Sequence, residues 1–291
     1  MNSTSGKNDF VLYDFDAAFE EYLKRWFDDN RGKYATYDEM EDQVPEVYQA
    51  FLDSPQPFID GRKPGEFFDR YDDADQLVQW MLRYEEEGVS VPDMLLNRIS
   101  ELGDAAARSL IKVLCETTRP ASVRMSAITL LRELESALPY PMYVEWAAAW
   151  DGQDEMTENA IESLEAAETD LTEQIMPHLK NATPVGKAAL LSILSHRPCE
   201  KPVIDMAIAL FEEHPELRAQ LASVLARFED DSVLPALMKA ASSDETGYLV
   251  YIELRSAIEA LGGEAPRRRF DEDDPEYASM RSLEEKLIRG E

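Results

Sequence analysis

The sequence predicts an all-α protein, an α-solenoid of about six stacked helix pairs with an irregular helical N-terminal cap and a C-terminal helix. Three observations lead to this fold class. Apolar residues from Pro92 onward recur at i, i+3, i+4 and i+7 in blocks of about ten to eighteen residues, which is the helical period. Strand-like alternation is hard to find. The blocks also resemble one another, as stacked supersecondary units do.

Composition sets the class of protein and of partner. The 291 residues are 44% hydrophobic, enough for one large folded domain or two ordinary ones. The net charge of -30 repels phosphate backbones and anionic lipids, so we expect neither a nucleic acid nor a membrane partner. Cys115 and Cys199 form no disulfide framework, and residues 1–16 contain no apolar leader. These features predict a cytoplasmic protein.

Residues 1–91 differ from the rest of the chain in composition and in the regularity of their apolar pattern. Helical periodicity is present in residues 15–27, 40–52 and 77–84, but aromatic residues are frequent and several prolines interrupt the pattern. Because the ends of a solenoid expose apolar surface, we expect this segment to form a helical cap.

Residues 92–263 carry the repeat. Each block has an apolar anchor near the middle of a first helix, and successive anchors are 29, 33, 29, 31 and 37 residues apart. The anchors are Ile99, Ile128, Ile161, Leu190, Leu221 and Ile258. A helix pair of this size cannot bury its own apolar face, so the pairs must stack and share a core. We therefore expect every anchor to be buried.

A second apolar helix follows each of the first five anchors. These second helices are predicted at residues 105–117, 141–150, 171–179, 202–211 and 233–241. Asp104, Asp170 and Asp231 precede or begin three of them, where a carboxylate caps free amides; an acidic binding ladder is the alternative. Basic residues near the start of four first helices are expected to pair with these aspartates: Arg124, Lys187, Arg218 and Arg255.

Residues 264–291 are predicted to form a charged linker and a final amphipathic helix. Gly262 and Gly263 end the last repeat helix, and Pro275 is suited to the first turn of the next one. The apolar side of this helix contains Tyr277, Met280, Leu283 and Leu287. It either packs back on the solenoid or binds a partner.

Three stretches within residues 92–263 resemble a known repeat family. They are Ile99-Ser-Glu-Leu-Gly-Asp104, Leu217-Arg-Ala-Gln-Leu-Ala222 continuing to Val233-Leu-Pro-Ala-Leu237, and Leu254-Arg-Ser-Ala-Ile-Glu-Ala-Leu-Gly262. Residues 92–263 are similar to short HEAT-like repeats, also found in phycobilisome-lyase-type proteins, with a period shorter than the usual HEAT length of about 40–47 residues. The resemblance implies a scaffold whose concave face is lined by the second helices. It implies no reaction.

No residue pattern predicts a catalytic, cofactor-binding or metal site. Asp28, Asn30 and Glu39 have calcium-loop spacing, but Lys33 occupies the position that requires glycine, and Thr36 with Glu39 can form a capping box instead. His196 and Cys199 lack the further ligands of a tetrahedral site.

Tyr143, Trp146 and Trp150 form an aromatic face that suits either core packing or a partner-binding hot spot.

Together these features favour a non-catalytic scaffold that binds a protein partner on the concave face of the solenoid. The alternative is an enzyme on the same scaffold, of the lyase or DNA-glycosylase type. In the second helices, the helical period places apolar residues inward and turns charged ones outward. The outward residues predicted to bind the partner are Arg108, Lys112, Glu173, Asp205 and Lys239.

Overall fold

The computed structural model describes residues 11–270 and 274–289, with the side chains of 283–289 excluded. These residues are helical and contain no β-strand; one isolated antiparallel bridge joins Gln56 and Arg62. The chain divides into two compact units after Leu138. The all-α prediction is confirmed. The boundaries at residues 91 and 263 stay predictions.

Unit 1 contains the first seven α-helices and two short 3-10 helices. Their bounds are α1 Phe15–Asn30, α2 Tyr37–Glu41, α3 Val44–Asp53, η1 Pro57–Ile59, η2 Pro64–Glu66, α4 Ala74–Glu86, α5 Asp93–Glu101, α6 Asp104–Cys115 and α7 Ala121–Glu133. Helix α1 packs on α3, while α4 packs on α5 and α6, and α6 packs on α7.

Unit 2 contains the remaining helices. Their bounds are α8 Tyr140–Ala149, α9 Glu155–Glu165, α10 Thr172–Leu179, α11 Pro184–Ser195, α12 Lys201–Glu213, η3 Pro215–Leu217, α13 Arg218–Arg227, η4 Asp231–Val233, α14 Leu234–Ala241, α15 Tyr248–Ala260 and α16 Pro275–Arg289. Among the described helices, none is long and apolar enough to cross a membrane.

Aromatic side chains build the core at the start of unit 1. The ring of Phe15 lies 5.6 Å from those of Phe58 and Phe67, both in edge-to-face arrangements. The hydroxyl of Tyr84 in α4 donates to the carbonyl oxygen of Tyr13 at 2.9 Å and so ties α4 to the chain before α1. Edge-to-face pairs contribute beyond the area they bury, which explains the aromatic richness seen in the sequence.

The predicted anchors are buried. Ile99, Ile128, Leu190, Leu221 and Ile258 have no exposed surface, and the remaining anchor is only slightly exposed, Ile161 at 7%. The five second helices are also present, each within a few residues of its predicted bounds. The 3.6-residue pattern therefore identified the core correctly.

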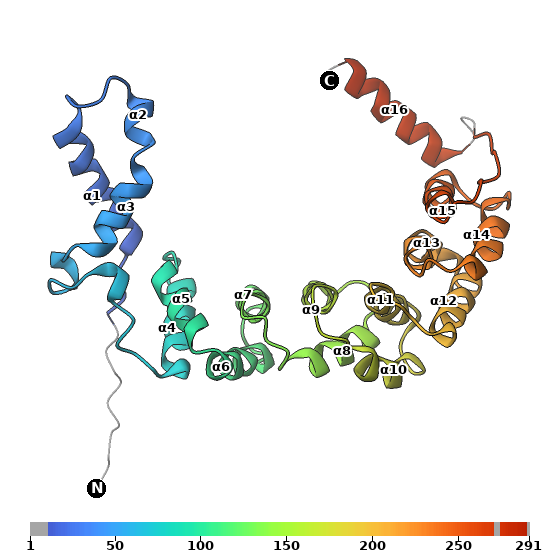
Figure 1. Cartoon of the computed structure of the whole chain (residues 1–291), viewed down its shortest axis with the longest axis horizontal. Helices are drawn as coiled ribbons and strands as arrows, with labels where there is room; N and C mark the ends of the chain where they lie inside the picture. Colours follow the sequence, from blue (N-terminus) through green and yellow to red (C-terminus); the bar gives the residue numbers. More distant parts are fainter. Residues whose placement is uncertain (1–10, 271–273, 290–291) are drawn as a thin grey trace, which may run out of the picture. The chain divides into compact units, whose positions relative to one another are not determined.

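In unit 2 the helices pack as two rows. The first helices α9, α11, α13 and α15 contact one another in sequence, and the second helices α8, α10, α12 and α14 pack beside them. Within this unit Figure 1 shows the first helices on the inner side and the second helices on the outer side. The expected concave placement of the second helices is thus not seen in unit 2.

Helices α8 and α11 approach each other closely at Gly186. A Cβ atom there would lie 2.4 Å from the carbonyl oxygen of Ala147 and 2.6 Å from that of Ala148. Thr183 holds the contact, because its backbone N–H donates to Ala148 O at 3.0 Å and its hydroxyl donates to Trp150 O. The same hydroxyl accepts from Gly186 N and caps α11.

Helix capping differs in part from the prediction. Asp170 does accept from a backbone amide, that of Thr172, at 2.9 Å. The prediction that Asp104 and Asp231 are caps is wrong, because each lies in the first turn of its helix. The cap residue of α6 is Gly103, and that of η4 is Asp230, which accepts from Ser232 N. Gly103 has a φ of 51°, a conformation that side chains disfavour.

The basic residues of the first helices do not pair with the predicted aspartates. Arg124 donates to the carbonyl oxygen of Leu114 at 2.8 Å, and Arg218 donates to that of Phe211 at 3.4 Å. Both carbonyls lie at the C-terminal end of the preceding second helix, where free carbonyls attract cations. Arg255 instead pairs with Glu259 of its own helix.

The start of α16 packs against α15. A carboxylate oxygen of Glu276 accepts from Leu249 N at 3.0 Å, and the Tyr277 ring lies 5.1 Å from that of Tyr248. The first turn of α16 therefore packs back, as one of the two predicted possibilities requires. Leu283 and Leu287 lie outside the described side chains, as do residues 271–273 of the linker.

Candidate functional site

The five residues predicted to bind a partner are all exposed, and we call them the second-helix face. In unit 1, Arg108 and Lys112 lie one turn apart on α6 with more than 60% of their side chains exposed. The ammonium group of Lys112 bonds both carboxylate oxygens of Asp75 in α4 at 2.8 Å. This ion pair fixes α6 against α4 and holds a cation at the surface.

In unit 2 the second-helix face comprises Glu173 on α10, Asp205 on α12 and Lys239 on α14. Asp205 pairs with Lys201 at 2.8 Å on its own helix. Lys239 reaches Glu212 of α12 at 3.2 Å and so links two neighbouring second helices. The face therefore carries both signs of charge.

The helical phase behind this prediction holds for most positions. Leu110, Leu114, Ile175, Leu179 and Leu237 are buried on the opposite side of these helices. Three further residues expected to point inward are only half-buried, because they lie at the edge of the apolar stripe: Ile111, Ile208 and Met238.

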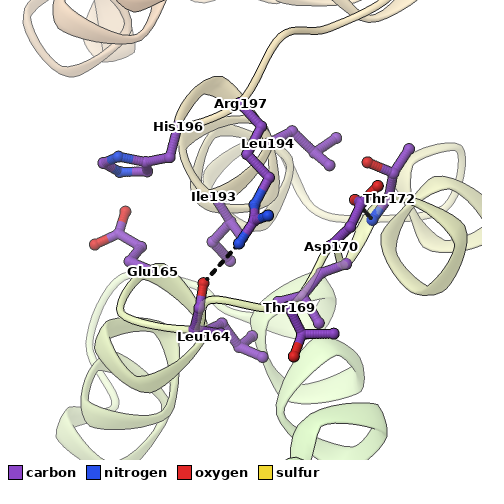
Figure 2. A pocket seen from close by; sticks show the side chains of 11 residues that line it. Leu164, Glu165, Thr169, Asp170, Thr172, Ile193, Leu194, His196 and Arg197 are labelled. Carbon is purple, nitrogen blue, oxygen red and sulfur yellow. Dashed lines mark hydrogen bonds between the residues drawn. The ribbon is translucent and has the colours of Figure 1, made fainter.

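A polar pocket of about 290 Å³ lies between the α9–α10 turn and the end of α11 (Figure 2). Figure 2 shows the Arg197 side chain in its middle, with His196 and Glu165 to one side and Asp170 and Thr172 to the other. This pocket lies within unit 2, and sequence reasoning did not find it.

The charged groups of this pocket already serve the helix ends. The guanidinium of Arg197 donates to the carbonyl oxygen of Ala167 at 2.9 Å and also to that of Glu168, just beyond the end of α9. Hydrogen bonds from Thr172, together with the more distant charge of Arg197, lower the pKa of Asp170. Arg197 therefore stabilises the turn after α9, and the pocket beside it has room for a small polar group.

A hydrogen-bonded chain connects three first helices beside the pocket. Ser192 of α11 donates to Glu165 of α9 at 2.7 Å and accepts from Arg227 of α13 at 2.8 Å. Arg227 also donates to Ser195 at 2.8 Å. Each of these hydrogen bonds joins residues that are 27 to 35 positions apart, so no local sequence motif predicts them.

The other candidates from the sequence are structural. Asp28 and Asn30 belong to α1, so the calcium-loop spacing falls partly on a helix. Thr36 caps α2 as predicted by accepting from Glu39 N at 3.2 Å, while the Glu39 carboxylate accepts from Ala35 N rather than from Thr36 N. Over residues 11–270 and 274–282 no group of three or more His, Cys, Asp or Glu side chains could hold a metal ion.

The side chain of Cys199 is half-buried. Burial, aided by the charge of Asp170, raises the pKa of its thiol, and the Sγ atom donates to Leu194 O at 3.1 Å. Because the thiolate is the nucleophilic form, this environment lowers its reactivity.

The aromatic face of α8 is mainly a packing surface. Tyr143 is buried, while Trp146 and Trp150 are half-buried. The Tyr143 and Trp146 rings are 5.8 Å apart. The packing alternative is thus the better description of Tyr143, and the two tryptophans contribute to both core and surface.

No protein-family model, curated protein or solved structure matches this chain. The resemblance of residues 92–263 to HEAT-like repeats stays an expectation from the sequence.

Proposed function

We propose that the chain is a non-catalytic, cytoplasmic interaction scaffold of about six HEAT-like helix pairs that binds a protein partner through the second-helix face. One observation carries this proposal: four second helices, α6, α10, α12 and α14, bury most of their apolar residues and expose the five charged residues of the face. Within each unit, exposed charged residues on the second helices offer a partner several contact points.

The chemistry of the face favours a protein partner with a defined orientation. Its five members carry three positive and two negative charges, so a partner must match a pattern rather than a single sign. The net charge of -30 across the chain favours a partner with complementary positive charge and disfavours nucleic acid and anionic membranes. In unit 2 this surface is the outer row of helices (Figure 1).

Quantitative affinity capture from native lysate tests the proposal, with wild type compared against two variants. Four of the five residues lie in ion pairs. The three in pairs of 3.2 Å or less receive neutral replacements to avoid new repulsion, whereas the pair of Arg108 with Asp104 is longer, at 3.6 Å, and exposed. The face variant combines Arg108→Glu, Lys112→Gln, Glu173→Lys, Asp205→Asn and Lys239→Gln. The control variant has the same charge changes at other exposed positions: Arg25→Glu, Arg267→Gln, Glu253→Lys, Glu264→Gln and Arg269→Gln.

We expect at least one protein to be captured by wild type and by the control variant but lost with the face variant. Recovery of the same proteins by all three baits would contradict the assignment of the face. Retention by the face variant together with loss on removing α16 would move the binding site to the C-terminal helix.

A further inference from the structure

A second exposed groove lies in unit 1, between α1 and α2. It has a volume of about 310 Å³. Its lining is Glu20, Leu23, Lys24, Phe27, Asp28 and Arg31 from α1 and its C-cap, with Tyr37 and Met40 from α2. None of these residues belongs to the second-helix face.

The α1 residues of the groove form one straight stripe. They are spaced i, i+3, i+4, i+7, i+8 and i+11 from Glu20 to Arg31, which is the spacing of one helix face. Eleven residue steps correspond to about 16 Å, or about three helical turns. This length matches that of a short helix lying along α1.

The apolar part of the groove is exposed mainly at Tyr37. Met40 is buried at 4% exposure, whereas Tyr37 is 63% exposed and is the most exposed large apolar side chain of the described residues. The ring of Phe27 is stacked on that of Tyr37, with centroids 5.4 Å apart and planes 9° apart. Leu23, which also lines the groove, is half-buried.

A different face of α1 makes the contact with the rest of unit 1. Phe19 packs against Tyr48 with ring centroids 4.8 Å apart, and both Phe19 and Tyr22 pack against Phe51 of α3. The packing of α1 on α3 therefore does not depend on Tyr37. This separation allows Tyr37 to be changed without removing the core contacts of α1.

The surroundings of the groove are acidic. Residues 11–54 contain twelve acidic and four basic side chains, a net charge of -8. Asp38 and Glu41 flank the groove residues Tyr37 and Met40 along α2. The charges of the lining itself balance, with Glu20 and Asp28 against Lys24 and Arg31, so the acidic excess comes from the residues around the groove.

We propose that the α1–α2 groove binds a basic amphipathic helix of about three turns from a protein partner. Apolar side chains at i, i+3 or i+4, and i+7 of that helix contact Leu23, Phe27 and Tyr37. Its lysines and arginines face the acidic rim of α1 and α2. Charge complementarity selects this occupant, because an acidic or neutral helix would not offset the rim.

A labelled Leu/Lys peptide of about 14 residues, with leucines on one helical face, is the direct probe. A second peptide of identical composition, scrambled to abolish the apolar face, controls for attraction to the net negative charge. Fluorescence anisotropy is measured on the full chain as wild type, as Tyr37→Ala and as Leu249→Ala. Leu249 is a matched control because it is also exposed, at 46%, and lies in unit 2.

We expect wild type to bind the amphipathic peptide about tenfold more tightly than the scrambled one, a hot-spot-sized difference. Tyr37→Ala should remove that difference while Leu249→Ala preserves it. Equal affinity for both peptides, or an unchanged preference in Tyr37→Ala, overturns the proposal. A dimer in sedimentation that Tyr37→Ala abolishes also overturns it, since the groove would then hold a second copy.

The proposal is independent of the proposed function. The face variant described above retains every groove residue and should bind the peptide as wild type does. Failure of the peptide experiment leaves the second-helix face untouched.

Discussion

Replacing Gly186 by alanine tests the closest helix contact in unit 2. In an exposed helix interior this change stabilises a protein by about 1 kcal/mol, because alanine has the higher helix propensity. Here the new methyl group would lie 2.4 Å from Ala147 O and 2.6 Å from Ala148 O. A carbon–oxygen contact needs about 3.3 Å, so the end of α8 must move by about 1 Å.

The cost of this movement outweighs the gain in helix propensity. Overpacking of this kind costs about 1–3 kcal/mol. Weakening the 3.0 Å bond from Thr183 N to Ala148 O adds to it, and such a bond contributes about 1 kcal/mol. After subtracting the propensity gain of about 1 kcal/mol, we expect Gly186→Ala to destabilise the chain by about 1–3 kcal/mol.

Urea denaturation followed by far-UV circular dichroism measures this free energy, and hydrogen exchange at the α8 and α11 amides localises it. The chain has two units, so its unfolding can depart from two-state behaviour. In that case the change in stability is taken from the hydrogen-exchange data instead of the urea transition. Gly32→Ala is the matched control, since no atom lies within 4 Å of its Cβ position. It should change stability by less than about 0.5 kcal/mol. A Gly186→Ala protein as stable as wild type, or more stable, would refute the close approach of α8 and α11.

Two further predictions concern the core. Leu221 is fully buried, so Leu221→Ala should cost about 2–5 kcal/mol in urea denaturation, and a loss below about 1 kcal/mol would contradict its place in the shared core. Burial raises the pKa of Glu85, whose Oε2 atom is buried without a hydrogen-bond partner. The stability linked to this group is therefore complete below the ordinary pKa of 4.5 and is lost as pH rises through the raised value. Glu85→Gln should raise the melting temperature relative to wild type at pH 7 but not at pH 4; an equal shift at both pH values would show that the carboxylate is not responsible.

The sequence predicts the core of this protein well because burial follows the helical period. Ile128 and Leu221 could be named as core residues from spacing alone, and both are fully buried. The errors lie at the edges of the apolar stripe, where Ile111 and Met238 are only half-buried. A residue's phase fixes the direction of its side chain but not how far its neighbours extend over it.

The partners of the contacts between helix pairs could not be predicted from the sequence. The sequence predicts that Arg124 pairs with an aspartate, but its acceptor is the backbone carbonyl of Leu114, which has no sequence signature. In the chain of hydrogen bonds from Glu165 through Ser192 to Arg227, the two bonds join residues that are 27 and 35 positions apart. The role of Tyr37 in the groove likewise depends on its stacking beside Phe27 and on its exposure, and neither has a sequence signature.

Binding through the second-helix face is tested most directly by the dissociation constant of a purified partner. The constant is measured by calorimetry for wild type, the face variant and the control variant, alongside their melting temperatures. Exposed charges contribute less than about 1 kcal/mol each to folding, so all three proteins should melt within a few degrees of one another. We expect binding at least about tenfold weaker for the face variant and unchanged binding for the control variant. Equal dissociation constants for all three proteins, with folding intact, would contradict it.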